Sequence, residues 1–125
     1  MHSHNYFHRD IKPENLLVSG ETVKIADLGL ARTVDSTRPL TAYVSTRWYR
    51  APEVLMRARA YSCPVDVWAA GCILGELYRL DALFAGDTEI DQLAQIFAAT
   101  GLPTAETWAE GANILREHNV RFNIV

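Results

Sequence analysis

The sequence of 125 residues has little of several features that would define its class directly. Its two cysteines, Cys63 and Cys72, exclude a disulfide framework and favour reduced thiols. Seven glycines and five prolines are too few for a collagen-like repeat or a disordered, low-complexity chain. The net charge is −3, whereas non-specific binding to a nucleic-acid phosphate backbone requires an excess of basic residues, so we expect no nucleic-acid partner.

Long hydrophobic runs are also missing. The longest, residues 64–80, is short for a membrane span and contains Asp66, Glu76 and Arg79. The first residues, MHSHNYFH, lack the basic and apolar regions of a signal peptide. We therefore expect no membrane partner and a protein of the cytoplasm or nucleus.

What is present is an ordinary globular composition, 49% hydrophobic and 22% charged, which suits one modest domain. Near the front, two short apolar runs at 16–18 and 23–25 are separated by turn residues and predict a small β-hairpin. Residues 33–46 are polar without a clear period, which predicts a long loop of the kind that is usually functional or mobile.

Helical patterns dominate the remainder. Pro52 begins a predicted short helix, and a longer helix is expected from near Pro64, with Ser62 or Cys63 as its cap. Further helices are predicted from Asp87 or Thr88 up to Gly101 and Pro103, and over 109–116. The fold class is thus α+β, mainly α, with one hairpin.

The helix expected from Pro64 has apolar residues on nearly every side, which predicts a position in the middle of a core. The other predicted helices are too few to cover it, so the sequence is expected to be part of a larger unit. Asp66 is conspicuous in this helix because a buried carboxylate needs hydrogen-bond donors, although it also suits the positive end of the helix dipole.

Two groups of polar residues near the N-terminus could carry chemistry. His2, His4 and His8 could hold a metal, but their loose spacing supplies no complete ligand set, and ordinary histidines are the simpler interpretation. The stretch FHRDIKPENLL, residues 7–17, places Asp10, Lys12 and Asn15 on one loop.

Phosphoryl transfer to a hydroxyl needs such a set. Asp10 could orient the acceptor and take its proton, and Lys12 could neutralise charge on the transferred group. Asn15 and a second carboxylate, Asp27, could hold magnesium, and the hairpin would return Asp27 to the side of Asn15. A hydrolase that uses Asp10 and Asp27 with a metal is an alternative, but it leaves the later motifs unexplained.

Those motifs give the sequence a specific resemblance. HRDIKPEN, then DLG seventeen positions after Asp10, then APE at 51–53 and DVWAAGCILGEL resemble the ordered motifs of eukaryotic protein kinases. TAYVSTRWYRAPEVL, with its TxY pair, is similar to MAP kinases and closer to the RCK subfamily related to male germ cell-associated kinase, within the CMGC branch. ELYRLDALFAGDTEIDQLAQIFAATGLP also resembles that subfamily.

The resemblance implies a serine/threonine kinase that uses ATP and Mg²⁺. Asp10 would be the catalytic base, Lys12 would contact the γ-phosphate, and Thr46 would hydrogen-bond near both. Asn15 and Asp27 would bind magnesium. Taken singly, Lys12 is simply a solvated lysine and Thr46 a turn residue. The occurrence of all these residues in the order of the kinase motifs favours catalysis.

Two further residues receive structural roles from the resemblance. Asp66 would hold the backbone of the catalytic loop from beneath, and Glu53 would pair with an arginine from the last helices of the domain. Leu28 replaces the commoner Phe of DFG and is expected to fill the same apolar slot, and Ala42 stands where relatives often have an acidic residue.

The long loop implies a switch. Phosphate on Thr41 or Tyr43, added by an upstream kinase, would bring negative charge that nearby arginines could pair with. The resemblance assigns these arginines as follows: Arg9 and Arg32 for the threonine, Arg47 and Arg50 for the tyrosine. An ordinary polar loop with surface arginines is the alternative. Val44 and Arg50 match positions that favour a Ser/Thr-Pro substrate.

The resemblance is to part of a kinase domain, a large-lobe (C-lobe) fragment over residues 1–125. No glycine-rich phosphate loop and no VAIK-like lysine occur in these residues, and the family's last helices are not matched. Two functions therefore compete: an incomplete catalytic domain of a proline-directed kinase, and a non-catalytic fragment that acts as a binding module. Association with cilia follows only by family analogy.

Overall fold

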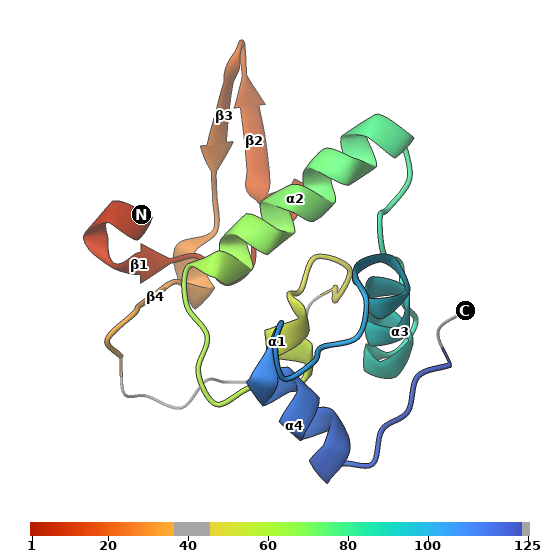
Figure 1. Ribbon diagram of the computed structural model, residues 1–125. Helices are drawn as coiled ribbons and strands as arrows, with labels where there is room; N and C mark the ends of the chain where they lie inside the picture. The colour runs from red at the N-terminus through yellow and green to blue at the C-terminus, as the bar shows by residue number, and fades with distance from the viewer. Residues whose placement is uncertain (37–45, 124–125) are drawn as a thin grey trace.

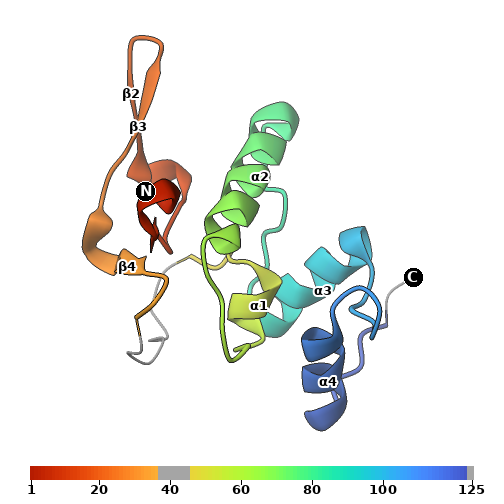
Figure 2. The ribbon, with the colours of Figure 1, turned by 60° about the vertical axis from the view of Figure 1, so that its left-hand side comes forward.

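The computed structural model describes residues 1–36 and 46–123 (Figure 1). Within them, four α-helices follow two small antiparallel sheets, which agrees with the predicted α+β class dominated by helices. The helix α2 lies between the β2–β3 hairpin on one side and α3 with α4 on the other, as both ribbon views show (Figures 1 and 2). None of the described helices is long and apolar enough to cross a bilayer.

The front of the chain forms short extended elements. β2 (Leu16–Ser19) pairs with β3 (Thr22–Ile25), and Gly20 in the turn between them has φ +60°, a conformation that glycine adopts without a steric penalty. The predicted hairpin is therefore confirmed and is one residue longer in each strand. A second sheet pairs β1 (Tyr6–Phe7) with β4 (Arg32–Thr33), and short 3₁₀ turns occupy Pro13–Asn15 and Leu28–Leu30.

The predicted helices are confirmed with small shifts at their ends. α1 (Pro52–Leu55) has its proline in the first turn, and α2 spans Pro64–Arg79. α3 (Glu89–Thr100) begins after Thr88, whose side-chain oxygen accepts a hydrogen bond from the backbone N–H of Asp91. α4 covers Ala109–Glu117. Among the four described helices a side-chain cap is formed only at the start of α3, whereas α1 and α2 begin with a proline in their first turn.

The main core lies where α2 meets α1, α3 and the loop before α3. Its largest members are fully or nearly fully buried, among them Ile96 and Phe97 of α3, and Trp68 stacks on Phe84 at its edge. Burial raises the pKa of the Cys72 thiol to about 11, so this cysteine behaves as a small apolar side chain.

The position predicted for α2, in the middle of a core, is wrong for its outer face. Val67, Leu74, Leu77 and Tyr78 are between 56% and 85% exposed. An open apolar groove of about 750 Å³ separates this face from the hairpin. The apolar pattern is real, but within the described residues the other helices cover α2 on one side only, which agrees with the expectation that they are too few.

Candidate functional site

The loop that precedes Asp10 is held from below by Asp66 in the first turn of α2. The Oδ2 atom of Asp66 accepts a hydrogen bond from the backbone N–H of His8 at 2.7 Å, and its Oδ1 atom accepts one from Arg9 at 2.9 Å. His2 Nε2 lies 2.8 Å from the same carboxylate. Arg9 has φ 74°, an unfavourable conformation for a long side chain, and these bonds compensate its cost.

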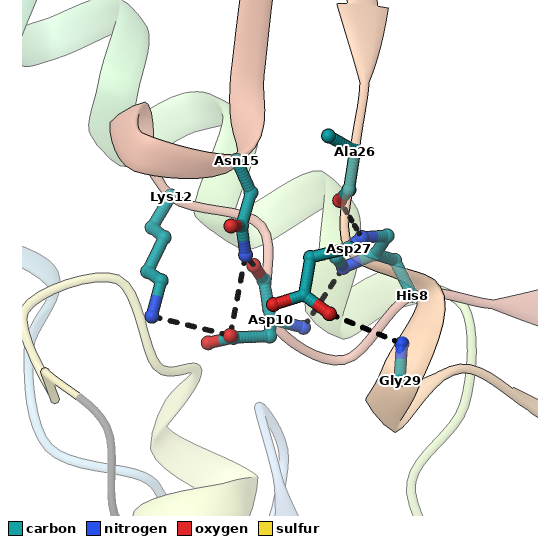
Figure 3. Close-up of polar contacts among 7 residues, drawn as sticks. All are labelled: His8, Asp10, Lys12, Asn15, Ala26, Asp27 and Gly29. Carbon is teal, nitrogen blue, oxygen red and sulfur yellow. Dashed lines mark hydrogen bonds and ion pairs between the residues drawn. The ribbon is translucent and has the colours of Figure 1, made fainter.

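His8, which is completely buried, connects this loop to the end of the hairpin. Its Nε2 lies 2.8 Å from the carbonyl oxygen of Ala26, and its Nδ1 lies 3.2 Å from the backbone nitrogen of Asp10 (Figure 3). Because a carbonyl can only accept and a backbone N–H can only donate, the proton is on Nε2. The backbone N–H of Ala26 also donates to the carbonyl of Asn15 at 2.8 Å. The residue before Asp27 is thus fixed to both ends of the loop.

The side chains of Asp10, Lys12 and Asn15 form one polar group on this loop. The Nζ atom of Lys12 lies 3.2 Å from Asp10 Oδ2. The side-chain amide of Asn15 donates to the carbonyl of Asp10 at 2.8 Å and to its Oδ2 at 3.2 Å. Asn15 is buried, whereas Asp10 is partly exposed. The carboxylate of Asp10 is therefore oriented by a cation and an amide and still reaches solvent.

Asp27 carries the second carboxylate of the group. It has φ 59° and its Oδ1 accepts a hydrogen bond from the backbone N–H of Gly29 at 3.2 Å. In the view of Figure 3 this carboxylate is turned toward that of Asp10. The expectation that the hairpin returns Asp27 to the side of the loop agrees with the bonds of Ala26 to His8 and Asn15.

No three His, Cys, Asp or Glu side chains gather as metal ligands in the described part of the chain, so His2, His4 and His8 do not form a metal cluster there.

The oxygen atoms of the polar group around Asp10 nevertheless fit a magnesium ion. One carboxylate, from Asp27, and one amide oxygen, from Asn15, are oxygen ligands that Mg²⁺ accepts when phosphate and water complete its shell. The side-chain nitrogen of Asn15 donates to Asp10, so the oxygen is the atom of that amide that could bind a metal.

Beside the polar group lies a narrow cavity of about 20 Å³, with room for about one water molecule. Its polar lining includes Arg9, Asp10, Lys12, Thr46 and Arg50. The structure therefore brings Thr46 to the same cavity as the predicted catalytic pair, although Thr46 itself is exposed.

The four arginines assigned to phosphate binding have different surroundings. The Arg9 guanidinium donates to the Leu30 carbonyl at 3.5 Å and to the Tyr61 hydroxyl at 3.3 Å. Arg32 donates to the backbone and side-chain oxygens of Ser36 at 3.1 and 2.7 Å.

The other two arginines lie after the long loop. Arg47 Nη1 donates to the Asp87 carbonyl at 2.7 Å, whereas Arg50 lines the cavity beside Asp10. Thr41, Ala42, Tyr43 and Val44 lie outside the described residues.

Two expectations near the site need separate comment. Leu28 is 59% exposed, so the apolar slot expected for it is not formed among the described residues, where no core side chain packs over it. Glu53, in the first turn of α1, has its pKa raised by burial, opposed by a hydrogen bond from its own backbone. No ion pair of Glu53 is found within residues 1–36 and 46–123.

Several polar contacts around the site were not predicted. Three of them join segments that are far apart in the sequence: His2 with Asp66, Tyr49 with Glu76, and Gln92 with Trp48. For Gln92 a signal existed, since it falls on the same face of its helix as Leu93 and Ile96, where an amide must find partners. For His2 and Tyr49 the sequence offers no comparable signal.

Comparisons with known proteins agree with these motifs. Residues 1–120 match the protein kinase domain family. Cyclin-dependent kinase F-3 of Oryza sativa subsp. japonica is 57% identical over 122 residues, which are 98% of this chain and 28% of that protein. Serine/threonine-protein kinase MAK of Homo sapiens is 54% identical over 123 residues, 98% of this chain and 20% of that protein.

Serine/threonine-protein kinase ICK of Rattus norvegicus is 58% identical over 112 residues, 89% of this chain and 18% of that protein. The chain thus spans between 18% and 28% of the length of these curated relatives.

Proposed function

The chain belongs to the protein kinase family, with CMGC-type kinases as relatives, and we propose that it supplies the catalytic loop of an enzyme that transfers phosphate from ATP to serine or threonine. The observation that carries the proposal is the Asp10–Lys12–Asn15 group. The side chains of Lys12 and Asn15 each lie 3.2 Å from Asp10 Oδ2, on a loop whose backbone is fixed by Asp66 and His8.

In this proposal Asp10 accepts a hydrogen bond from the substrate hydroxyl and takes its proton as the bond to phosphorus forms. Lys12, 3.2 Å from Asp10 Oδ2, places a positive charge where negative charge develops on the transferred group. Thr46 lines the same cavity and offers a hydroxyl for a hydrogen bond near both residues.

Asn15 and Asp27 are the proposed ligands of Mg²⁺, which when bound neutralises charge on the phosphates of ATP. The amide nitrogen of Asn15 is committed to Asp10, so its oxygen is the ligand atom. The bond from Gly29 to Oδ1 of Asp27 fixes the second carboxylate. Asn15 and Asp27 would hold the ion on the side of the loop where the carboxylate of Asp10 is exposed to solvent.

The finer properties rest on the sequence motifs. We infer a preference for proteins with Ser/Thr-Pro from Val44 and Arg50, and control by an upstream kinase that phosphorylates Thr41 or Tyr43. Arg9 and Arg32, with Arg47 and Arg50, are the proposed partners of these phosphates. Arg9 and Arg50 share the cavity with Asp10, which supports a link between a phosphate there and the catalytic group.

Residues 1–125 are proposed to form part of the large lobe of the kinase domain, without the glycine-rich loop that covers ATP. We therefore expect no appreciable transfer by the isolated chain. A second function, a non-catalytic module that binds another protein, is favoured by one observation: the exposed apolar face of α2 beside a groove of about 750 Å³.

The test is Asp10→Asn in the protein encoded by the complete transcript, assayed with Mg-ATP and a peptide that contains Ser-Pro. We expect kcat to fall by about 10²–10⁴-fold because the base is lost. Asp81→Asn, which changes an exposed carboxylate that accepts a hydrogen bond from the backbone N–H of its neighbour Ala82, is the matched control and should leave kcat unchanged. Equal activity of wild type and Asp10→Asn would refute the proposal.

A further inference from the structure

The segment that carries Thr46 and Arg50, residues 46–50, is held by side chains of the helices α2 and α3 and by a backbone carbonyl of the loop between them. On one side the hydroxyl of Tyr49 donates to Glu76 Oε2 of α2 at 2.6 Å. On the other side two bonds cross to residues 84–92. Arg47 Nη1 donates to the carbonyl of Asp87 at 2.7 Å, and Gln92 Nε2 donates to the carbonyl of Trp48 at 3.3 Å.

Gln92 is the centre of the second set of contacts. It is completely buried, and each part of its amide is used. Nε2 donates to the carbonyls of Trp48 and Phe84, and Oε1 accepts from the backbone N–H of Gly86 at 2.8 Å. A buried amide is tolerated only when it is satisfied in this way, and its bonds are directional where apolar packing is not.

The chain around Gln92 is fitted closely to it. A Cβ atom on Gly86 would lie 2.4 Å from the backbone nitrogen of Gln92 and 2.7 Å from its Oε1. Only glycine therefore allows the turn before α3 to approach the amide. The neighbours Leu93, Ile96 and Phe97 already bury the apolar face of α3, so burial alone does not require a glutamine at this position.

We propose that Gln92 is a positioning residue for the protein-substrate side of the site, acting through the Trp48 carbonyl on residues 46–50. Gln92 does not line the cavity beside Asp10, whereas Thr46, Tyr49 and Arg50 do. The orientation of these three residues relative to Asp10 depends on where Trp48 is held. This inference rests on the proposed kinase function for its consequence, but the positioning itself is a property of the fold.

The test compares Gln92→Met with Gln95→Met. Methionine keeps the length of the side chain and removes its hydrogen bonds. Gln95 lies one turn further along α3, and its bonds go to Ala85 and Asp91 at 2.9 and 3.1 Å, within the same loop and helix. The control therefore loses an amide that contacts the turn before α3 and leaves the bond to Trp48 intact.

The first readout is amide hydrogen exchange, which does not depend on activity. We expect exchange in residues 46–51 to rise about 10-fold in Gln92→Met, as for one lost hydrogen bond, with no rise in Gln95→Met or in residues 6–33. If Gln92→Met does not fold, Gln92→Glu keeps the acceptor for Gly86 and removes the donor to Trp48, and the same pattern is expected. Unchanged exchange in residues 46–51, or an equal rise throughout the chain, overturns the proposal.

The second readout is steady-state kinetics in the protein encoded by the complete transcript. Gln92→Met should raise KM for the Ser-Pro peptide by about 5–10-fold, with KM for ATP within about twofold of wild type. A fall in kcat with an unchanged peptide KM overturns the substrate-side role. If wild type transfers no phosphate, the proposed function fails, while the exchange contrast between Gln92→Met and Gln95→Met still decides the positioning.

Discussion

Residues 6–33 and residues 46–118 are held in place by different forces. Of the buried apolar side chains in the described structure, only Phe7 and Ile11 come from the front part. Most of the side chains of the β2–β3 hairpin are exposed. The helical part supplies nearly all of the core, from Tyr49 through Phe97.

The front part is connected instead by polar contacts. Asp66 binds the backbone of His8 and Arg9, His8 binds Ala26 and Asp10, and the strand pair β1–β4 adds a short ladder. Hydrogen bonds contribute less net free energy than apolar burial but define direction more sharply. The candidate catalytic group is therefore oriented by hydrogen bonds to α2, and the stability of α2 itself comes from the helical core.

The largest effect that the comparison predicts is in the helical core. Ile96→Ala removes a completely buried side chain and should lower the free energy of unfolding by about 3 kcal/mol, within the 2–5 kcal/mol usual for such cavities. Ile25→Ala, in the 50%-exposed strand position, should cost less than about 1 kcal/mol. Urea unfolding of the 125-residue chain followed by circular dichroism measures both.

These two variants are matched in chemistry and differ in burial, so they examine the contrast directly. Because isoleucine also favours extended structure, a small loss for Ile25→Ala is expected from the strand itself. Equal losses for the two variants would show that the hairpin is packed as tightly as α3, and the distinction between the two regions would be lost.

The next effect concerns the bonds that connect the two regions. Asp66→Asn keeps the shape of the side chain but puts a donor where a second acceptor is needed by the N–H groups of His8 and Arg9. We expect a loss of about 2 kcal/mol, the usual cost of leaving a buried group unsatisfied. Hydrogen exchange should rise in residues 6–33 and stay as in wild type in residues 89–117.

Asp81→Asn serves again as the control, because its carboxylate is exposed and accepts its hydrogen bond from the neighbouring backbone N–H of Ala82. The expected asymmetry follows because Asp66 of α2 orients the backbone of the loop, while most of the core around α2 comes from the helical part. A uniform rise in exchange over both regions would mean that the front part stabilises α2 as much as α2 orients the front part.

The helices and the hairpin could be predicted because local signals define them. Thr88 and Gly101 mark the ends of α3, Pro52 starts α1, and apolar runs flank the turn at Gly20. The strands β1 and β4 could not be predicted, since two residues have no detectable period.

For the site, spacing and residue type predicted which side chains belong together, but not how they are oriented. That Asn15 turns its nitrogen to Asp10, and that His8 spans Ala26 and Asp10, depends on tertiary contacts. The same holds for α2, where an apolar pattern on all sides predicted complete burial and the outer face is exposed. A sequence pattern states what a helix can bury, and only the neighbouring elements decide what it does bury.

The smallest effect compares the two carboxylates that lie at helix starts, Glu53 of α1 and Asp66 of α2. Asp66 is surrounded by donors, whereas burial raises the pKa of Glu53 above its ordinary value of 4.5. A raised pKa in the folded state means that the protonated form is favoured there. Its stabilising contribution is present below the unfolded pKa and is lost as the pH rises through the folded one.

At pH 7 the ionised carboxylate of Glu53 therefore destabilises the fold slightly, and Glu53→Gln, which resembles the protonated form, should raise Tm of the 125-residue chain by about 1–2 °C. The gain should disappear when thermal unfolding is repeated below pH 4, where Glu53 is protonated in both states. A variant that is less stable than wild type at pH 7 would mean that the carboxylate has a cation partner that outweighs its burial. Glu53 would then resemble Asp66, and the contrast between a satisfied carboxylate and a merely buried one would no longer separate the two helices.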